Sequence, residues 1–344
     1  MIRFRNPGTQ YTTQVQVFKE LYKEYKDAPS FDLDMASTIT KTKLMTAYGY
    51  AGDAALALSN TENDSLNSTK MNAKMYAEVF RLLGWITSAG SGSYPLVFTY
   101  IGEHAALADD VLPLYEQCVL GINNPQEIMD VKYDEKVRFF KAALFSLEDL
   151  DGIMYKHELC LGPMSINDLD YEQYKRMITY LKRLRGSYAR YQAAYQELCD
   201  RLQVKSTLPD NSTRLPIAFM KTCSWIVSER TRSLYPPKSL ECLRLTEHGK
   251  EVAASLHSVK DLRLDEYYTY PTETRKALIR LGVYSMLSRA GYDTSPVQDT
   301  IEQDEAVCAN ILQDKELLFS PYQTLHHSVV DEALGIKRTA TGSR

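Results

Sequence analysis

The most constraining feature of this sequence is a repeat built around its two tryptophans, Trp85 and Trp225. An amphipathic segment precedes each Trp, and each Trp is followed directly by Ile at the start of a short apolar run. Further on comes a Thr, Thr99 after 14 residues and Thr246 after 21, and both Thr residues lead into Ala-rich helical text. Such internal similarity indicates that two parts of the chain fold in the same way.

Each copy predicts a helix, a short strand, a polar hairpin, a second strand, and a helix capped by Thr. This order is that of a winged-helix subdomain. The first hairpin tip, residues 88–93, holds only Ser, Ala and Gly, whereas the second is longer and carries Arg230, Arg232 and Lys238. We therefore expect Trp85 to superpose on Trp225 and Thr99 on Thr246, with the longer wing in the second unit.

The whole chain is predicted to be mainly α with small β wings: tandem winged-helix subdomains plus a C-terminal helical region. The expected divisions are an N-terminal winged-helix unit at 1–112, a helical or winged-helix-like linker unit at 113–205, a second winged-helix unit at 206–260, a C-terminal helical platform at 261–335 attached to the second unit, and a flexible tail at 336–344. In the linker unit we expect a short helix at 154–161. A long basic helix starts at Tyr171 and has a possible break at Gly186-Ser187.

Charge is distributed unevenly along the chain. Lys and Arg total 40 against 44 Asp and Glu, a net charge of −4, which excludes a uniformly basic nucleic-acid-binding coat. Residues 171–260, however, hold 16 basic and 8 acidic residues, a net charge of +8. This segment therefore predicts a local anion-binding face, with a solvated helix surface as the alternative.

The helix before each Trp is the one expected to enter a DNA groove, because polar and basic side chains near a helix N-terminus suit base-edge and phosphate contacts. The expected contacts in the first unit are Lys70, Asn72, Lys74 and Arg81, and in the second Ser212, Thr213, Arg214 and Lys221. Arg176, Arg183 and Arg190 recur every seven residues and predict a basic ridge along the sugar-phosphate backbone. The wing adds Arg230, Arg232 and Lys238. Docking to another protein is the alternative role of such units.

No catalytic motif in the sequence lies on a predicted helix or strand that suits its chemistry. Asp134-Glu135-Lys136 lies on a predicted helix, where a charge cluster near the N-terminus explains it better than a nuclease site. His248 and Lys250 match His-x-Lys, but Ser255 stands where the accompanying Asp is required. His326-His327 has no further ligand nearby, so a packing role is expected. No nucleotide-binding motif occurs, and no cofactor or metal is assigned to this chain.

Cysteine usage and hydropathy indicate the compartment. The six cysteines are far apart and form no CxxC pair, so we expect reduced core thiols. No window of 18 apolar residues occurs, and the first residues lack the apolar stretch of a secretory signal. A cytoplasmic protein without a membrane partner is expected.

Residues 3–9, the wing-and-helix units ending at 243–250 and the helical unit between them resemble the recognition half of FokI-like and related type IIS restriction endonucleases, over about residues 1–260. In that family several winged-helix subdomains read an asymmetric DNA site and a separate domain cuts. The resemblance implies sequence-specific binding of double-stranded DNA, with Arg3, Arg5 and Asn6 among the contacts.

Family members continue into a PD-(D/E)xK domain, and this chain ends where that domain would begin. Cleavage, with its Mg²⁺, is therefore expected from another domain or a nuclease subunit. Two alternatives stay open: a winged-helix transcriptional regulator or assembly scaffold without nuclease activity, and a diverged nuclease.

Overall fold

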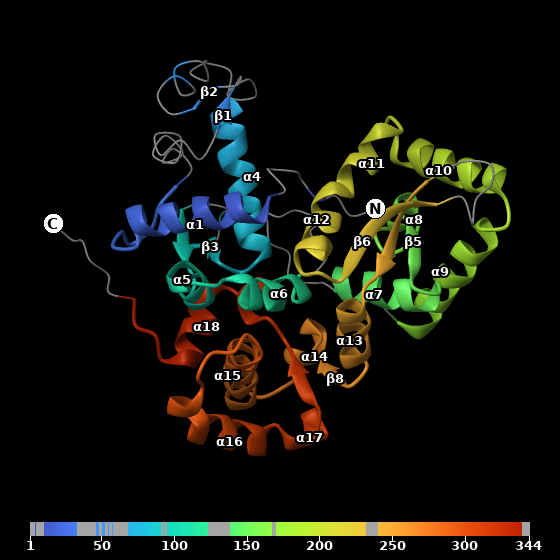
Figure 1. The fold of residues 1–344 in the computed structure, drawn as a ribbon. Coiled ribbons are helices and arrows are strands. Elements are labelled where there is room, and N and C mark those ends of the chain that lie inside the picture. Colours follow the sequence, from blue (N-terminus) through green and yellow to red (C-terminus); the bar gives the residue numbers. More distant parts are fainter. Residues whose placement is uncertain are drawn as a thin grey trace. The chain divides into compact units, whose positions relative to one another are not determined.

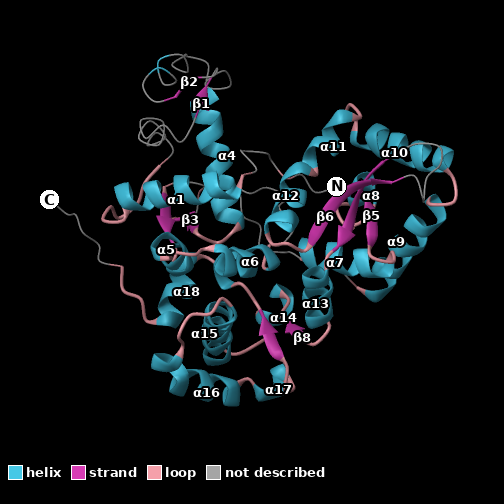
Figure 2. Ribbon diagram, in the orientation of Figure 1, coloured by secondary structure: helices cyan, strands magenta, loops and turns pink. Residues whose placement is uncertain are grey.

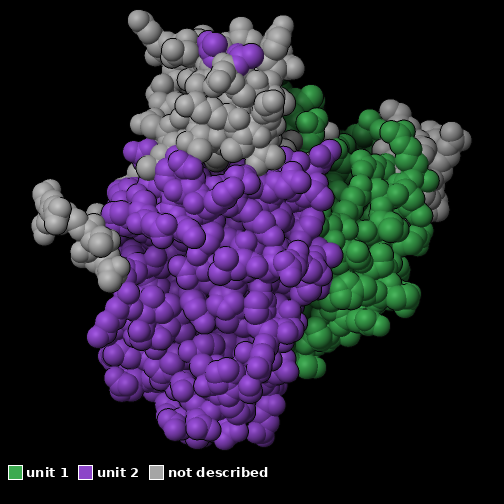
Figure 3. Space-filling view, turned by 60° about the vertical axis from the view of Figure 1, so that its left-hand side comes forward, with its two compact units in different colours: residues 1–6, 122–126, 134–263 green, residues 7–121, 127–133, 264–344 purple. Residues whose placement is uncertain are grey.

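The computed structural model of the protein describes residues 4, 10–32, 46–47, 50–51, 54, 57, 68–90, 92, 95–122, 138–166, 170–231 and 240–338 (Figure 1). The chain forms two compact units, coloured separately in Figure 3. Unit 1 holds residues 1–6, 122–126 and 134–263, and unit 2 holds residues 7–121, 127–133 and 264–344. Helices dominate and the sheets are small (Figure 2), so the prediction of a mainly α protein with small β elements is confirmed.

Unit 2 is built from both ends of the chain. Its first part contains α1 (Tyr11–Tyr25), β1 (Thr46–Ala47), β2 (Tyr50–Ala51), α4 (Ser68–Leu82), β3 (Ile86–Ser88), β4 (Leu96–Phe98), α5 (Tyr100–Leu107) and α6 (Leu112–Leu120). Its second part contains α14 (Leu264–Tyr267), α15 (Thr272–Arg289), η3 (Ser295–Val297), α16 (Gln298–Val307), α17 (Ala309–Leu312), β9 (Glu316–Leu318), η4 (Pro321–Gln323) and α18 (His327–Leu334).

Unit 1 is nearly continuous in sequence. It contains α7 (Phe139–Asp149), β5 (Ile153–Tyr155), α8 (Lys156–Leu161), α9 (Tyr171–Leu184), α10 (Tyr188–Leu202), α11 (Thr207–Ser212), α12 (Arg214–Thr222), β6 (Ile226–Thr231), β7 (Leu240–Leu245), α13 (Glu247–Leu256) and β8 (Val259–Asp261). Its sheet has the strand order β5-β7-β6, with antiparallel neighbours.

The two tryptophans lie at equivalent junctions, which we name the first Trp junction (residues 80–102) and the second Trp junction (residues 220–249). In each, the Trp N–H donates to the carbonyl five residues earlier, and the Trp carbonyl accepts the N–H of the downstream Thr, all at 2.9–3.0 Å. Each Trp is followed at once by a strand, as the sequence predicted. Thr99 and Thr246 cap α5 and α13 through their hydroxyls, so the expected Thr caps are confirmed.

Glycine permits the close approach of the capped helix to each Trp. A Cβ at Gly102 would lie 2.0 Å from the carbonyl oxygen of Trp85, and a Cβ at Gly249 would lie 2.1 Å from that of Trp225. In both junctions this Gly N–H donates to the Thr hydroxyl at 2.9 Å. Because local hydrogen bonds and one steric requirement recur together, the two junctions share one backbone geometry.

Strand pairing extends the repeat beyond the hairpins. In both junctions the residue after Trp lies opposite the residue before Thr. A third segment then pairs with the second hairpin strand: Phe31 bridges Leu96, and Met154 lies opposite Leu243. The short helix expected at 154–161 is therefore wrong at its start, where Met154 belongs to β5, because pairing with β7 outweighs local helix propensity. The second hairpin has six-residue strands against three in the first, so the second hairpin is the longer one, as expected.

Aromatic packing fixes both junctions in their cores. Trp85 and Trp225 are both 0% exposed. The ring of Trp85 lies 4.7 Å from that of Phe18 on α1, and Trp225 lies 5.9 Å from Phe140 on α7, centroid to centroid. Burying 150–250 Å² of indole at roughly 25 cal/mol per Å² contributes at most about 4–6 kcal/mol per Trp.

The C-terminal helices pack with the first Trp junction's unit rather than with the second, which differs from the expected attachment. Arg289 on α15 donates to Gln117 on α6 at 2.8 Å, and Gln323 donates to the carbonyl of Cys118 at 2.9 Å. The physical reason is that α15 buries apolar side chains along its length and needs partners, which α6 and α18 supply.

The long basic helix expected from Tyr171 is two helices. α9 ends at Leu184, and Ser187 caps α10 by accepting the N–H of Arg190. The possible break at Gly186-Ser187 is therefore confirmed, because the Ser hydroxyl starts a new helix there. In consequence the seven-residue recurrence does not lie on a single helix: Arg176 and Arg183 are on α9, and Arg190 is on α10.

Candidate nucleic-acid interface

The helix before the second Trp presents one narrow polar stripe. α12 buries Leu215, Ile217, Phe219 and Met220, which anchors it to the core of unit 1. Its exposed residues are Arg214 and Lys221, with the half-buried Ala218 between them. Asn211, exposed at the end of α11, continues the same three- and four-residue spacing. We name these four residues the α12 stripe.

Arg214 and Lys221 carry uncompensated charge. Neither has an acidic side chain within ion-pair distance in the part of the chain that the structure describes. Arg214 is the first residue of α12, where the helix dipole and the free backbone N–H groups add positive potential. The stripe is therefore a cationic surface on a rigid helix.

Two predicted contacts in this helix are wrong. Ser212 is 5% exposed and Thr213 is 0% exposed, so neither side chain can reach an external ligand. The physical reason is their place in the helical period, because both continue the inward-facing row that includes Pro209, Pro216 and Phe219. Asn211 is the polar residue that the structure exposes beside Arg214, and a count of three residues back from Arg214 could have found it.

The corresponding helix of unit 2, α4, is enclosed. Asn72 and Lys74 are half-buried and Arg81 is 7% exposed, so the prediction of Arg81 on a polar face is wrong. No residue from Asn72 to Ser88 is exposed. Arg81 is therefore buried among its neighbours rather than presented to solvent. The side chain of Lys70 lies outside the described residues.

The second hairpin contains two described cations, Arg230 and Arg244. Arg230 on β6 is exposed, whereas Arg232 and Lys238 lie outside the described residues. Nearby, Arg244 donates from Nε to Glu229 at 2.9 Å, and this hydrogen bond lowers the pKa of the Glu229 carboxyl. Arg244 is thus engaged in a cross-strand pair, and Arg230 is the hairpin cation left for a ligand.

The predicted ridge residues Arg176, Arg183 and Arg190 are all exposed. With Lys175 and Lys182, also exposed, they form what we name the α9 basic face. Arg185 is excluded from it, because its guanidinium donates to Glu158 at 2.8–2.9 Å beneath the helix. Glu158 is 0% exposed, so this Arg serves the core.

The structure does not bring the α12 stripe and the α9 basic face together. Phe219 of α12 packs on Phe140 near the start of α7, with 5.8 Å between centroids, whereas Tyr174 of α9 donates to Asp149 at the end of α7, at 2.6 Å. The nine-residue step from Phe140 to Asp149 spans about 13 Å of helix. Figure 1 shows α12 and α9 on opposite flanks of the sheet of unit 1.

The remaining predicted contacts, Arg3, Arg5 and Asn6, lie outside the described residues, as does Asp134-Glu135-Lys136. His248 and Lys250 are exposed on the first turns of α13, where Lys250 pairs with Glu247 at 2.7 Å. His327 bonds Asp331 and the carbonyl of Ala89, each at 3.2 Å. His327, the second residue of the His326-His327 pair, therefore contacts the first hairpin among the described residues, which agrees with the expected packing role.

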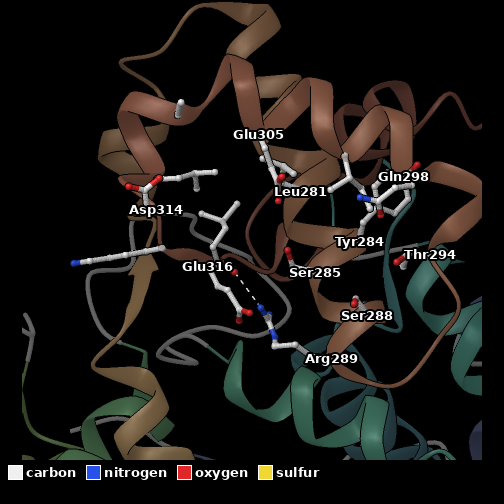
Figure 4. A pocket seen from close by; sticks show the side chains of 15 residues that line it. Leu281, Tyr284, Ser285, Ser288, Arg289, Thr294, Gln298, Glu305, Asp314 and Glu316 are labelled. Carbon is white, nitrogen blue, oxygen red and sulfur yellow. Dashed lines mark hydrogen bonds between the residues drawn. The ribbon is translucent and has the colours of Figure 1, made fainter.

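Sequence reasoning missed a pocket in unit 2. A hollow of about 550 Å³ lies among α15, α16, α17 and β9 (Figure 4). Arg289 lines it, but its guanidinium is engaged with Gln117 and with the carbonyl of Leu317, the latter at 3.2 Å. The rim holds the acidic residues Glu305, Asp314 and Glu316 beside Lys315. Because the residues that line this hollow come from four elements, no local sequence pattern predicts it.

All six cysteines are buried and none forms a disulfide, which confirms the expected core thiols. The described residues contain no helix with the length and apolar character needed to cross a membrane. They also contain no cluster of three His, Cys, Asp or Glu side chains placed to hold a metal ion.

Comparison with known proteins gives no relative: the chain matches no protein-family model, and no curated protein resembles it significantly.

Proposed function

We propose that the protein binds double-stranded DNA in a sequence-specific way, as the recognition component of a type II restriction endonuclease. The observation that carries this proposal is the α12 stripe, in which Asn211, Arg214 and Lys221 stand exposed. Arg214 and Lys221 lie on α12, directly before a two-stranded hairpin, and both of their charges are uncompensated among the described residues. Cleavage, with its Mg²⁺, comes from another domain or a nuclease subunit.

The order of elements in unit 1 supports a winged-helix assignment. α7, β5, α8, the pair α11–α12, and the hairpin β6–β7 follow one another, with α9 and α10 interposed after α8. The first strand pairs with the last, in the order β5-β7-β6. In a winged-helix domain with this order, the helix before the hairpin is the one that docks in the major groove. That helix is α12.

The chemistry of the stripe suits base reading. An Arg guanidinium can bridge O6 and N7 of guanine, and an Asn amide can bridge N6 and N7 of adenine. Asn211, near the end of α11, lies three residues before Arg214, the first residue of α12, so both residues stand at the start of the helix that precedes the hairpin. We assign these two residues to neighbouring base pairs. Lys221, a point charge, is assigned to a phosphate, and so is Arg230 of the wing.

Unit 2 is proposed to act differently. Its α4 exposes no described side chain from Asn72 to Leu82, and its hairpin carbonyls at Ala89 and Gly90 accept hydrogen bonds from His327 and His326. A groove-reading helix needs a free face. This enclosure favours an assembly role for unit 2, which is also the observation behind the alternative of a scaffold or regulator without nuclease activity.

The test is selection of bound duplexes from a random library, followed by affinity measurements on the selected site and its single-base variants. Arg214→Ala should lose preference at one base pair by about 1–3 kcal/mol while binding to unrelated DNA is largely retained. Lys221→Ala should weaken binding to the selected site and to each of its single-base variants by the same factor, and should reduce the salt slope by about one. Arg201→Ala removes an exposed Arg from α10 and should change neither.

A protein that selects no sequence, or an Arg214→Ala variant with unaltered base preference, contradicts the proposal. Incubation with this chain and Mg²⁺ should leave the selected duplex uncut. Addition of a nuclease partner should then lead to cutting of the duplex. Cleavage by this chain alone would favour the diverged-nuclease alternative.

A further inference from the structure

The outer face of α9 has an unusual run of charge. From residue 173 to residue 196 the sequence contains no Asp or Glu. Over the same stretch the exposed charged residues are all cations, and they are the members of the α9 basic face: Lys175, Arg176, Lys182, Arg183 and Arg190. Tyr171, 70% exposed, and Tyr180, 40% exposed, stand among them. The exposed Glu172 and Glu197 bound this stretch, and between them the exposed charges are cations alone, which favours anions.

The cations of this face form no ion pair among the described residues, and Lys175 Nζ lies 5.3 Å from the centroid of the Tyr171 ring. Lys182, Arg183 and Arg190 have no ion pair among the described residues, whereas Arg138, Arg185 and Arg244 of the same unit all pair with carboxylates. Arg176 donates only to the Glu172 carbonyl of its own helix, at 3.2 Å. Free guanidinium and ammonium groups therefore point outward together.

Helical spacing arranges these charges in two rows. Lys175 and Lys182 are seven residues apart, as are Arg176 and Arg183, so each row spans about 10 Å of the helix. Arg190, exposed in the first turn of α10, is the next cation of this set along the chain. An extended cationic surface of this kind fits the regularly spaced phosphates of a nucleic-acid backbone better than a single small anion.

The α9 basic face and the α12 stripe occupy different parts of unit 1. The α12 stripe and α9 are anchored at opposite ends of α7 and lie on opposite flanks of the sheet (Figure 1). Duplex DNA has a persistence length of about 150 base pairs, so a short duplex seated on α12 stays straight past the unit. Two surfaces on opposite flanks then meet two different stretches of DNA.

We infer that the α9 basic face is a second DNA-binding surface, which holds a separate stretch of duplex by its phosphates without reading its sequence. Unit 1 then bridges two DNA segments, one read by α12 and one held by α9. The inference rests on the proposed function for the α12 half of the bridge, whereas the α9 half stands on its own charge and geometry.

The experiment uses the full chain and two duplexes of about two helical turns. Duplex A carries the selected site and is unlabelled, and duplex B lacks the site and carries a fluorophore. Protein is first mixed with one equivalent of A well above its dissociation constant, and the protein–A complex is then titrated into B at low salt while anisotropy is recorded. Binding of B should persist, with an affinity within about twofold of that for protein alone.

Two matched double variants, each losing one Lys and one Arg, separate the surfaces. Lys182→Ala/Arg183→Ala should weaken binding of B to the A-saturated protein about tenfold and reduce its salt slope by about two, while affinity for A is retained. Arg214→Ala/Lys221→Ala should weaken binding of A and leave B bound through α9. Both changed pairs are exposed, so the fold is expected to survive in each.

Displacement of B by one equivalent of A overturns the inference, because both duplexes then share one surface. An equal loss of affinity for A and B in Lys182→Ala/Arg183→Ala also overturns it. An unchanged affinity for B in the same variant overturns it as well. If the protein shows no base preference at all, the proposed function fails, and A is replaced by a second non-site duplex. The change in affinity for B caused by Lys182→Ala/Arg183→Ala then still decides whether α9 binds DNA.

Discussion

Substitution of Gly249 by Ala should destabilise unit 1 far more than its single added methyl suggests. The new Cβ would lie 2.1 Å from the Trp225 carbonyl oxygen and 2.9 Å from its carbon, so helix α13 or the strand must move by about 1 Å to restore van der Waals contact. That movement strains the bond from the Thr246 N–H to the Trp225 carbonyl and the Thr246 cap on the Gly249 N–H, both 2.9 Å long.

The magnitude combines two costs. Overpacking of a rigid site costs about 1–3 kcal/mol, and a lost N-cap about 1 kcal/mol. The higher helix propensity of Ala offsets at most about 1 kcal/mol of this. We expect the free energy of unfolding of unit 1 to fall by about 2–3 kcal/mol, which lowers its urea midpoint by about 1 M or more.

The assay uses the fact that each unit contains one fully buried Trp. In a Trp85→Phe background, fluorescence reports on Trp225 and hence on unit 1. In a Trp225→Phe background, it reports on Trp85, where Gly102→Ala should have the same effect in unit 2. Each Ala variant is compared with its own Trp→Phe parent. Gly186→Ala is the control in unit 1, because the nearest atom to its added Cβ is 3.8 Å away.

Equal urea midpoints for Gly249→Ala and Gly186→Ala would refute the steric argument. A large effect of Gly102→Ala with none for Gly249→Ala would refute the equivalence of the two junctions.

Further predictions concern single residues. Burial opposes ionisation of Asp261, but Arg138 and Lys141 outweigh it and lower the pKa of its carboxyl. The stabilisation is therefore present above the unfolded pKa near 3.8 and lost as pH falls through the lower folded value, so Asp261→Asn should flatten the acid limb of a urea-midpoint against pH profile. At neutral pH the same change should cost about 3–5 kcal/mol, because Arg138 stays buried without its partner. Thr246→Ala should cost about 1 kcal/mol in urea titrations, and Thr246→Ser should retain most of the cap, whereas equal losses in both would exclude capping. The six buried thiols should resist Ellman's reagent until denaturant is added, since burial raises the pKa of Cys118 to about 12, and rapid reaction of the native protein would contradict this.

Features governed by short-range interactions were accessible from the sequence. The Trp-Ile strand starts, the Thr caps and the break at Gly186-Ser187 each depend on residues within one or two turns of one another, so their signals survive without knowledge of the rest of the chain. The same holds for Arg214 at the start of α12, since a helix boundary is a local event.

Exposure depends on what packs against each face, and this the sequence pattern could not supply. Arg81 looked like a polar-face residue, yet α4 exposes no side chain from Asn72 to Leu82. Ser212 and Thr213 are small enough to be buried in an inward-facing row, so their polarity was a poor guide to exposure. β5 needed its partner β7, which lies some 90 residues further along the chain, to become a strand.

The arrangement of the cationic surfaces is also a tertiary property. Arg183 and Arg214 belong to one basic segment of sequence, and charge counting alone merged them into one face. The packing of α9 and α12 at opposite ends of α7 separates them, because each helix must bury its own apolar stripe where the core offers space. The chain's amino acids therefore specify which helices carry charge, while the packing of their apolar faces sets the direction in which that charge points.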